Sequence, residues 1–406
     1  MVSKKIYIIG GGAAGYFAAI TAAEANPEAQ VVILERGKDV LQKVKVSGGG
    51  RCNVTHACFL PKELTKNYPR GERELMSAFH TFAAGDTIDW FEKRGVELKI
   101  EDDGRMFPVT DSSRTIMDCL TLAAANAGVQ LTKGFRVEEI QYIENQGFML
   151  KAAHQKDILA DALIVATGSS TSVWDILKNL GHQIIEPVAS LFTFNIKDKR
   201  IADLAGLSVP NAVMQIVGSK LKTNGPLLVT HWGLSGPAAL RLSAWGAREL
   251  AVLNYNCIVT VNWRGVYTLA ETIEELTECK AVTPRQQPFS NPQFGIPARL
   301  WKSICEAENI TKEVNWADMN KKTIQALASQ LVEGQYVVTG KSTFKEEFVT
   351  SGGVSLKEID FKRFESKLFP NLYFAGEVLD IDAITGGFNF QAAWTGGFLA
   401  GRAAAS

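Results

Sequence analysis

The opening 35 residues of the chain carry a regular exchange of strand-type and helix-type patterns. Residues 4–9 form a short apolar run rich in β-branched side chains, which is typical of a strand buried on both faces. Residues 16–26 are rich in alanine and contain no glycine or proline, so they favour a helix. Residues 30–34 repeat the buried-strand pattern and lead to Glu35. The pattern therefore predicts a strand–helix–strand unit.

A glycine motif joins the first predicted strand to the helix. Residues 10–15 read GGGAAG and match the spacing G-x-G-x-x-G at Gly10, Gly12 and Gly15. The first glycine allows a tight turn, the second lets the backbone approach a pyrophosphate, and the third lets helix and strand pack closely. The N–H groups of the first turn, which includes Ala13 and Ala14, have no helical partners and suit a diphosphate. The motif predicts a dinucleotide site, with a glycine-rich turn that binds nothing as the alternative.

Two charged residues follow the second predicted strand. Glu35 lies twenty positions after Gly15, where a carboxylate accepts hydrogen bonds from ribose hydroxyls. The same carboxylate would repel a 2′-phosphate, so a site that prefers NADP is not expected. Arg36 would pair with a phosphate or lie against adenine, and a solvated surface arginine is the alternative.

Composition narrows the class of protein. A chain of 406 residues with 46% hydrophobic and 21% charged residues predicts two or three globular domains. The formal net charge is zero, which argues against nucleic acid or an anionic membrane as a partner. There is no apolar run of the ~18 residues that a membrane span needs, and a strand follows the first residues directly, so we expect a cytoplasmic protein. Six scattered cysteines without a C-x-x-C pair argue against a disulfide framework or a zinc site.

A second glycine-rich segment, residues 45–55, reads KVSGGGRCNVT. Three consecutive glycines cannot hold a helix or a good strand. They offer adjacent backbone N–H groups that can form a nest for an anion, and Lys45 and Arg51 add positive charge beside it. A flexible surface loop is the alternative.

The segment KVSGGGRCNVT after a GGGAAG turn resembles the signature of the YhiN/BaiN-type flavoprotein family. The resemblance continues at residues 228–238 (LVTHWGLSGPA), 350–354 (TSGGV) and 371–377 (NLYFAGE). It implies FAD bound on a Rossmann-like fold of the two-dinucleotide-binding-domain kind. It also implies that Val137, in the segment FRVEEI, meets adenine through its backbone, and that the strand ending in Ala166, Thr167 and Gly168 passes close to the cofactor.

The pattern of hydrophobic and polar residues changes more than once after residue 187. Residues 188–264 alternate in short runs separated by glycine, proline and asparagine, which predicts an antiparallel barrel or sandwich. Residues 268–334 predict a small helical insert, and residues 335–361 return to a β pattern. The expected division is a discontinuous α/β Rossmann-like FAD-binding domain (1–187 and 356–406), a β domain (188–267 and 335–355) and the insert (268–334).

The last forty residues decide which dinucleotide is expected. A strand at 371–377 ends in Gly376 and Glu377, and Gly386 and Gly387 open an alanine- and glycine-rich helix to residue 405. FAD is long and needs a second anchor, which a dehydrogenase that binds only NAD does not. The N-terminus of this helix would direct its dipole at the N1–C2=O edge of the flavin, with Asn389 beside it.

The predicted site residues fall into two sets. The cofactor-binding set is Gly10, Gly12, Ala13, Ala14, Gly15, Glu35, Arg36, Lys45, Gly49, Gly50, Arg51, Cys52, Asn53, Val137, Ala166, Thr167, Gly168, Gly376, Glu377, Asp380, Gly387, Phe388, Asn389 and Gln391. The catalytic candidates are His231 for proton transfer, Cys52 as a redox thiol and Arg105 for substrate contact; the alternatives are a structural histidine, a buried cysteine without a resolving partner and a solvated arginine. No metal site is expected.

The sequence thus predicts an FAD-dependent oxidoreductase that transfers a hydride between a small organic substrate and the flavin. One dinucleotide motif is present, so NAD(P)H would bind transiently as electron donor. An RNA-modifying flavoprotein is an alternative, although the neutral charge argues against it. A non-catalytic flavin-binding sensor is the other alternative.

Overall fold

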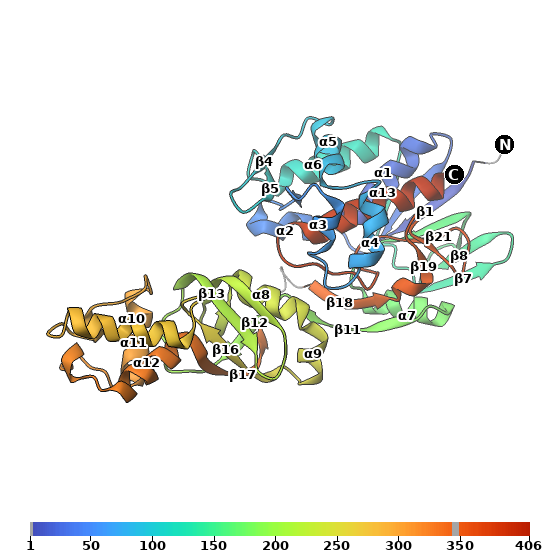
Figure 1. The fold of residues 1–406 in the computed structure, drawn as a ribbon. Helices are drawn as coiled ribbons and strands as arrows, with labels where there is room; N and C mark the ends of the chain where they lie inside the picture. Colours follow the sequence, from blue (N-terminus) through green and yellow to red (C-terminus); the bar gives the residue numbers. More distant parts are fainter. Residues whose placement is uncertain (1–2, 343–348) are drawn as a thin grey trace. The chain divides into compact units, whose positions relative to one another are not determined.

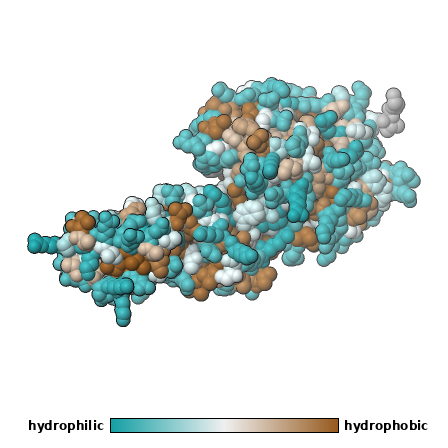
Figure 2. Space-filling view, in the orientation of Figure 1, coloured by the Kyte–Doolittle hydropathy of each residue, from teal (hydrophilic) through white to brown (hydrophobic). Residues whose placement is uncertain are grey.

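The computed structural model describes residues 3–342 and 349–406. These residues form two compact units, one of residues 3–188 with 349–406 and the other of residues 189–342 (Figure 1). Each unit has its own hydrophobic core. Hydrophilic residues cover most of the visible face of each unit, with scattered hydrophobic patches (Figure 2). The expected three-part division of the chain stays a prediction.

The first unit is built on a seven-stranded sheet in the order β19-β20-β21-β10-β1-β2-β6. Strands β21, β10, β1, β2 and β6 are parallel, as expected for buried strands joined by helices. Their bounds are β1 Lys5–Ile9, β2 Gln30–Glu35, β6 Gln130–Lys133, β10 Ala162–Val165, β19 Ile359–Asp360, β20 Glu365–Ser366 and β21 Leu372–Phe374. The predicted Rossmann-like α/β architecture is confirmed.

Helices α1 (Ala13–Ala25) and α13 (Phe388–Ala405) pack against each other within this unit. A Cβ added at Gly397 would lie 2.8 Å from the Ala14 carbonyl oxygen, and one at Gly401 would lie 2.4 Å from the Ala18 oxygen. Glycine and alanine therefore let two helices from opposite ends of the chain make backbone contact. The other helices are α2 Gln42–Gly50, α3 Pro61–Thr65, α4 Glu72–Phe79, α5 Ala84–Glu92, α6 Ser113–Asn126 and α7 Thr171–Leu180.

Small antiparallel sheets complete the first unit. One contains β3 (Thr55–His56), β4 (Leu98–Ile100) and β5 (Arg105–Pro108), and β4 and β5 form a hairpin whose turn includes Gly104. A second contains β7 (Glu139–Ile143), β8 (Gly147–Lys151) and β9 (Ile158–Ala160). Strand β11 (Ile184–Ser190) pairs with β18 (Val349–Val354). Residue 137 precedes β7 and is not a strand residue.

The second unit holds a closed six-stranded antiparallel barrel in the order β12-β15-β14-β13-β16-β17. Its strands are β12 Thr193–Ile196, β13 Ser208–Ile216, β14 Lys222–Val229, β15 Gly233–Ser235, β16 Asn256–Asn262 and β17 Gly334–Ser342, with helices α8 Gly236–Trp245 and α9 Ala247–Val252. The predicted insert is helical, with α10 Leu269–Val282, α11 Ala298–Ala307 and α12 Lys321–Glu333. No helix of the described residues is long and apolar enough to cross a membrane.

A buried histidine connects three segments of the first unit. His182 Nδ1 lies 2.7 Å from Glu358 Oε2, and its Nε2 lies 3.2 Å from the Ser366 hydroxyl. The Ser366 oxygen also accepts from the N–H groups of Leu368 and Phe369, so the hydroxyl donates its proton to His182. Burial lowers the pKa of His182, while the hydrogen bond to Glu358 opposes that shift. The imidazole is therefore a neutral structural link.

We predict that the stabilisation provided by His182 disappears in acid. The unfolded chain takes up this proton at a higher pH than the folded protein does. The contribution is therefore complete above about pH 6.5 and is lost as pH falls through the lowered folded-state pKa. Urea unfolding should show His182→Gln less stable than wild type near neutrality, with a difference that shrinks in acid. The exposed His80 supplies the control His80→Gln; a constant difference for His182→Gln would contradict the prediction.

Candidate functional site

The carboxyl ends of four adjacent parallel strands form the candidate site. In sheet order these strands are β2, β1, β10 and β21. The residues at or just beyond these strand ends are, in turn, Glu35, which is the last residue of β2, and Gly10–Gly12, Ala166–Gly168 and Gly376–Glu377. With neighbouring strands about 4.8 Å apart, the row of strand ends spans about 14 Å. Ligands of open α/β sheets bind at this edge, and its length suits an elongated dinucleotide.

The three glycines of the first motif meet different surroundings. A Cβ added at Gly10 would lie 2.5 Å from the Ala166 oxygen, and one at Gly15 would lie 1.9 Å from the Gly10 oxygen. A Cβ at Gly12 would meet nothing within 4 Å. Gly12 is the N-cap of α1 and has no capping side chain, and the first turn carries no acidic residue. The open space above these N–H groups fits a diphosphate.

Glu35 holds the loop around this cradle. Its two carboxylate oxygens each accept a backbone N–H, from Gly11 and from Gly37, both at 2.7 Å. Each oxygen keeps a second lone pair that a ribose hydroxyl can use. The Phe135 N–H donates to the Glu35 carbonyl at 2.9 Å, so the segment that contains the buried Val137 lies beside it. Arg36 is exposed, with its guanidinium 3.4 Å from the Ser170 hydroxyl.

Thr167 supplies a second sign that the edge is built for a ligand. Its hydroxyl is fully enclosed and has no hydrogen-bond partner among the described residues. A buried hydroxyl without a partner is costly, so a partner is expected from outside the chain. At the next strand end, Glu377 forms an ion pair with Lys43. Gly376 and the buried Asp380 lie beside it, and the Asp380 N–H donates to the Val354 carbonyl.

The GGG loop has the backbone that its composition predicts. Gly48, Gly49 and Gly50 all have positive φ, at 57°, 67° and 84°, so the right-handed turns of α2 end before them. Arg51 returns to the right-handed region, and Cys52 is left-handed again at φ 64°. Such alternation directs successive N–H groups into a concave nest. A Cβ at Gly49 or Gly50 would meet nothing within 4 Å, so this face of the loop is open. The neighbouring Lys45 side chain is exposed.

Asn53 joins this loop to the N-terminus of α13. With the amide oxygen assigned to the side that faces the Gly387 N–H, the orientation that satisfies its neighbours, Asn53 accepts from that N–H at 2.9 Å and donates to the carbonyls of Thr55 (3.0 Å) and Met106 (3.3 Å). Gly387 has φ 94°, and a Cβ there would lie 2.5 Å from the Thr55 oxygen. Only glycine fits this close, left-handed turn. The structure thus brings together two glycine turns that are separated by more than 330 residues in the sequence.

Two side chains in the predicted cofactor set are used inside the protein. Gln391 is fully buried; its Oε1 accepts from Thr55 (2.5 Å) and Thr87 (3.0 Å), and its Nε2 donates to Thr395 (3.1 Å). The polar atoms of this side chain thus serve a buried network, and contact of Gln391 with a cofactor stays a prediction. The Asn389 amide closes a loop by bonding both backbone groups of Ala383. For Asn389 only the backbone contact stays a prediction.

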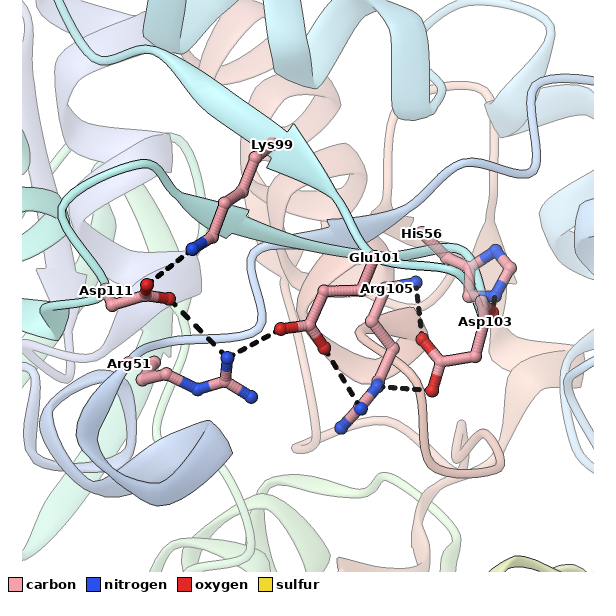
Figure 3. Close-up of polar contacts among 7 residues, drawn as sticks. All are labelled: Arg51, His56, Lys99, Glu101, Asp103, Arg105 and Asp111. Carbon is pink, nitrogen blue, oxygen red and sulfur yellow. Dashed lines mark hydrogen bonds and ion pairs between the residues drawn. The ribbon is translucent and has the colours of Figure 1, made fainter.

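The hairpin beside the GGG loop carries paired charges (Figure 3). Arg51 Nη1 lies 2.6 Å from Glu101, and Arg105 bonds both Glu101 (3.1 Å) and Asp103 (2.7 Å). The Arg51 guanidinium also stacks on the Phe107 ring at 3.9 Å. Burial alone would raise the pKa of Asp103, but hydrogen bonds from Arg105 hold it below its ordinary value. Both arginines are thus paired with carboxylates, and the predicted substrate contact of Arg105 stays a prediction.

Cys52 does not have the surroundings of a redox thiol. Its side chain is fully buried, and burial raises its pKa to about 12. A nucleophilic or redox cysteine requires the thiolate, which this environment suppresses at neutral pH. The side chain packs in the core beneath the loop. Its burial argues against the predicted role of Cys52 as a redox thiol.

His56 was missed in the sequence, although it directly follows KVSGGGRCNVT. Its ring stacks on Phe388, with centroids 4.6 Å apart, and its Nε2 lies 3.1 Å from the Asp103 carbonyl (Figure 3). Its Nδ1 is enclosed without a partner among the described residues. Burial lowers the pKa of His56, so the ring is neutral at the mouth of the α13 turn.

His231 lies in the second unit, in the turn between β14 and β15, and its side chain is exposed. It borders a cavity of about 680 Å³ that Lys197, Lys199 and Thr230 also line. Ser235, two residues after Gly233, bonds the Thr193 hydroxyl at 2.9 Å, which agrees with a structural role for this serine.

Fold and site together define a Rossmann-type flavoprotein. The chain belongs to the HI0933-like family: a family profile described as "HI0933-like protein Rossmann domain" matches residues 4–403. This membership confirms the resemblance to the YhiN/BaiN type and supports FAD as cofactor and FAD-dependent oxidoreductase as the enzyme class.

Two relatives and one solved structure match this chain over nearly its whole length. A 3-dehydro-bile acid delta(4,6)-reductase of Clostridium scindens is 28% identical over 99% of both chains. A ribosomal RNA dihydrouridine synthase of Escherichia coli K12 is 30% identical over 96% of this chain and 94% of the relative. A 3-ketosteroid-delta4-(5alpha)-dehydrogenase from Rhodococcus jostii RHA1 shares the fold, with a TM-score of 0.53 at 13% identity over 100% of this chain and 98% of that one.

A pair of glycine variants should separate folding from cofactor binding. We expect Gly15→Ala to lower the melting temperature even without flavin, because its Cβ collides with the Gly10 carbonyl. Gly12→Val should keep the stability of the flavin-free protein closer to wild type and lose most of the bound FAD, because its side chain fills the open cradle. Calorimetry of the flavin-free proteins and flavin absorbance after reconstitution measure both. Full FAD binding by Gly12→Val would contradict this site.

We also expect Cys52→Ser to leave the rate of flavin reduction and its pH dependence unchanged. The thiol is buried and stays protonated, so it takes no part in electron transfer. Stopped-flow reduction of wild type and variant across neutral pH provides the comparison. A drop in rate at constant flavin content would restore Cys52 as a candidate.

Proposed function

We propose that this protein is an FAD-dependent reductase that saturates a carbon–carbon double bond conjugated to a carbonyl group. The observation that carries the proposal is the contact between Asn53 and the Gly387 N–H, which joins the GGG loop to the N-terminus of α13. An NAD-binding fold needs only the first glycine motif. A second open turn, fixed against a helix N-terminus, is what a flavin ring at the far end of a dinucleotide requires.

The parts of the chain divide the work of binding. The first turn of α1 takes the pyrophosphate, and Glu35 takes the ribose of the adenosine half. When bound, FAD supplies the ring that accepts and returns the hydride. The N–H groups at the start of α13 stabilise negative charge at the edge of that ring. Ion pairs of Arg51 and Arg105 with Glu101, and of Arg105 with Asp103, hold the hairpin in place, and these two arginines and two carboxylates carry no net charge together.

The reaction class is supported by what the two relatives share. A delta(4,6)-reductase of a 3-dehydro bile acid acts on double bonds conjugated to a 3-oxo group, and a dihydrouridine synthase acts on the uracil double bond conjugated to the C4 carbonyl. In the reaction proposed for this chain, a hydride adds to the carbon distal to the carbonyl, the electron pair moves toward the carbonyl oxygen, and a proton adds to the other carbon. His231 is our candidate for proton delivery, because it is an exposed imidazole beside a cavity.

Two substrate classes remain in this proposal. A small conjugated ketone agrees with the neutral net charge of the whole chain. A uridine in ribosomal RNA agrees with the second relative and with a local charge imbalance: residues 189–264 contain eight Lys and Arg but three Asp and Glu. NAD(P)H as electron donor is part of the proposal in either case.

Two successive rapid-mixing experiments identify first the electron donor and then the substrate class. We expect NADH or NADPH to bleach the flavin band near ~450 nm, and the reduced protein to be reoxidised without oxygen by its substrate. A steroid-type 4,6-dien-3-one and an unmodified ribosomal RNA transcript are the two test acceptors. The flavin-depleted Gly12→Val protein is the control. Failure of every donor and acceptor would favour a non-catalytic flavin-binding sensor and contradict the proposed reductase.

A further inference from the structure

The turn between β14 and β15 presents two aromatic rings on a fixed backbone. The Thr230 N–H donates to the Gly233 carbonyl at 2.8 Å, and the Trp232 N–H donates to the Thr230 hydroxyl at 3.2 Å. The Trp232 carbonyl accepts from the Ile196 N–H at 2.9 Å, which pins the turn to β12. Although the backbone is bonded in this way, Trp232 is 56% exposed and His231 is also exposed. A large ring that is open to solvent on a hydrogen-bonded turn is suited to stacking.

A hollow with unneutralised lysines lies beside this turn. Thr230, His231 and Gly233 line the cavity of about 680 Å³, and Trp232 stands between two of these lining residues. The opposite part of the lining is the segment that follows β12, with Lys197 and Lys199. Asp198 between them is engaged by Arg200 through both carboxylate oxygens, and that contact lowers the pKa of Asp198 against the effect of burial.

The two lysines therefore keep their positive charge available for a ligand. Neither forms an ion pair with a described residue, and both are exposed. Asp203 is the remaining carboxylate of the lining. The wider barrel segment, residues 189–264, has five more Lys and Arg than Asp and Glu, whereas the whole chain is neutral. Positive charge is thus concentrated in the part of the chain that carries the exposed rings.

We propose that this hollow, lined by His231, Lys197 and Lys199, binds a single-stranded RNA segment together with the exposed Trp232, which follows His231 in the turn. A base stacks on the Trp232 ring, and flanking phosphates pair with the two lysines. Aromatic rings interleaved with basic side chains are how proteins bind single strands with little sequence preference. The choice of RNA rests on the ribosomal RNA arm of the proposed function, but the binding itself requires no flavin chemistry.

The test measures binding of a fluorescein-labelled oligouridylate of 12 nucleotides to the flavin-loaded full chain, by anisotropy over a range of KCl. We expect Trp232→Ala to weaken binding roughly fivefold or more, because stacking on one base is lost. Trp232→Phe, which keeps an aromatic face, should restore most of it. The double variant Lys197→Ala/Lys199→Ala should lower the slope of log K against log salt by about 1.4, or about 0.7 for each lost phosphate contact.

Matched controls come from the same unit. Trp245→Ala removes another exposed tryptophan, which is 39% exposed, and Lys321→Ala/Lys322→Ala removes two exposed lysines from α12. Thermal unfolding checks that each variant is folded. Equal losses in the control and test variants, an unchanged salt slope, or no binding by the wild type would each overturn the proposal. Reduction of a dienone without RNA binding would overturn it alone, whereas RNA binding without any flavin turnover would leave it intact and refute the proposed reductase.

Discussion

The hydrogen bonds of one asparagine organise the first unit around its cofactor edge. Asn53 comes from the loop that follows the second strand, yet its amide satisfies the N–H at the start of the last helix. That N–H belongs to a left-handed glycine with no room for a side chain. Removing the amide would take a partner from the Gly387 N–H and from the Thr55 carbonyl, whereas the Met106 carbonyl would keep its bond from the Val54 N–H. The two glycine turns are thus joined directly by one side chain.

The same arrangement explains why many polar side chains near this turn hydrogen-bond one another inside the protein. Gln391, Thr55, Thr87 and Thr395 form a closed network beneath the turn, and the Trp394 indole donates to the Val54 carbonyl at 2.9 Å. A helix packed on all sides cannot send these side chains toward a ligand. It presents its N-terminal backbone groups instead. Preorganised N–H groups need little reorganisation when charge develops on a bound ring, which is the property a flavin site requires.

Sequence patterns predicted the parts of the site that depend on local backbone geometry. The strand ends, the three glycines of the first motif and the left-handed glycines at 48–50 each follow from residue type and spacing. The barrel and the helical insert were also predictable, because period-two and helical patterns differ clearly over more than fifty residues each. These features need no knowledge of which distant segments meet.

Features that depend on distant contacts were not predictable. Gln391 meets threonines at positions 55, 87 and 395, and Cys52 is buried by packing that its neighbours in sequence do not reveal. Arg105 was predicted to contact the substrate, and the sequence did not reveal that the hairpin pairs it with Glu101 and Asp103. A single histidine in a sequence gives little indication of its role. The position of His56 at this turn becomes apparent only in the structure, where its ring stacks on Phe388.

The pairing of β11 with β18 has a consequence for how this protein can change over time. The chain leaves the Rossmann unit along β11 and returns along β18, so both crossings lie in one two-stranded ribbon. An insertion whose ends already touch adds little closure entropy to the host fold. The barrel and its helices can therefore be exchanged, lengthened or reshaped as a cassette without disturbing the sheet edge.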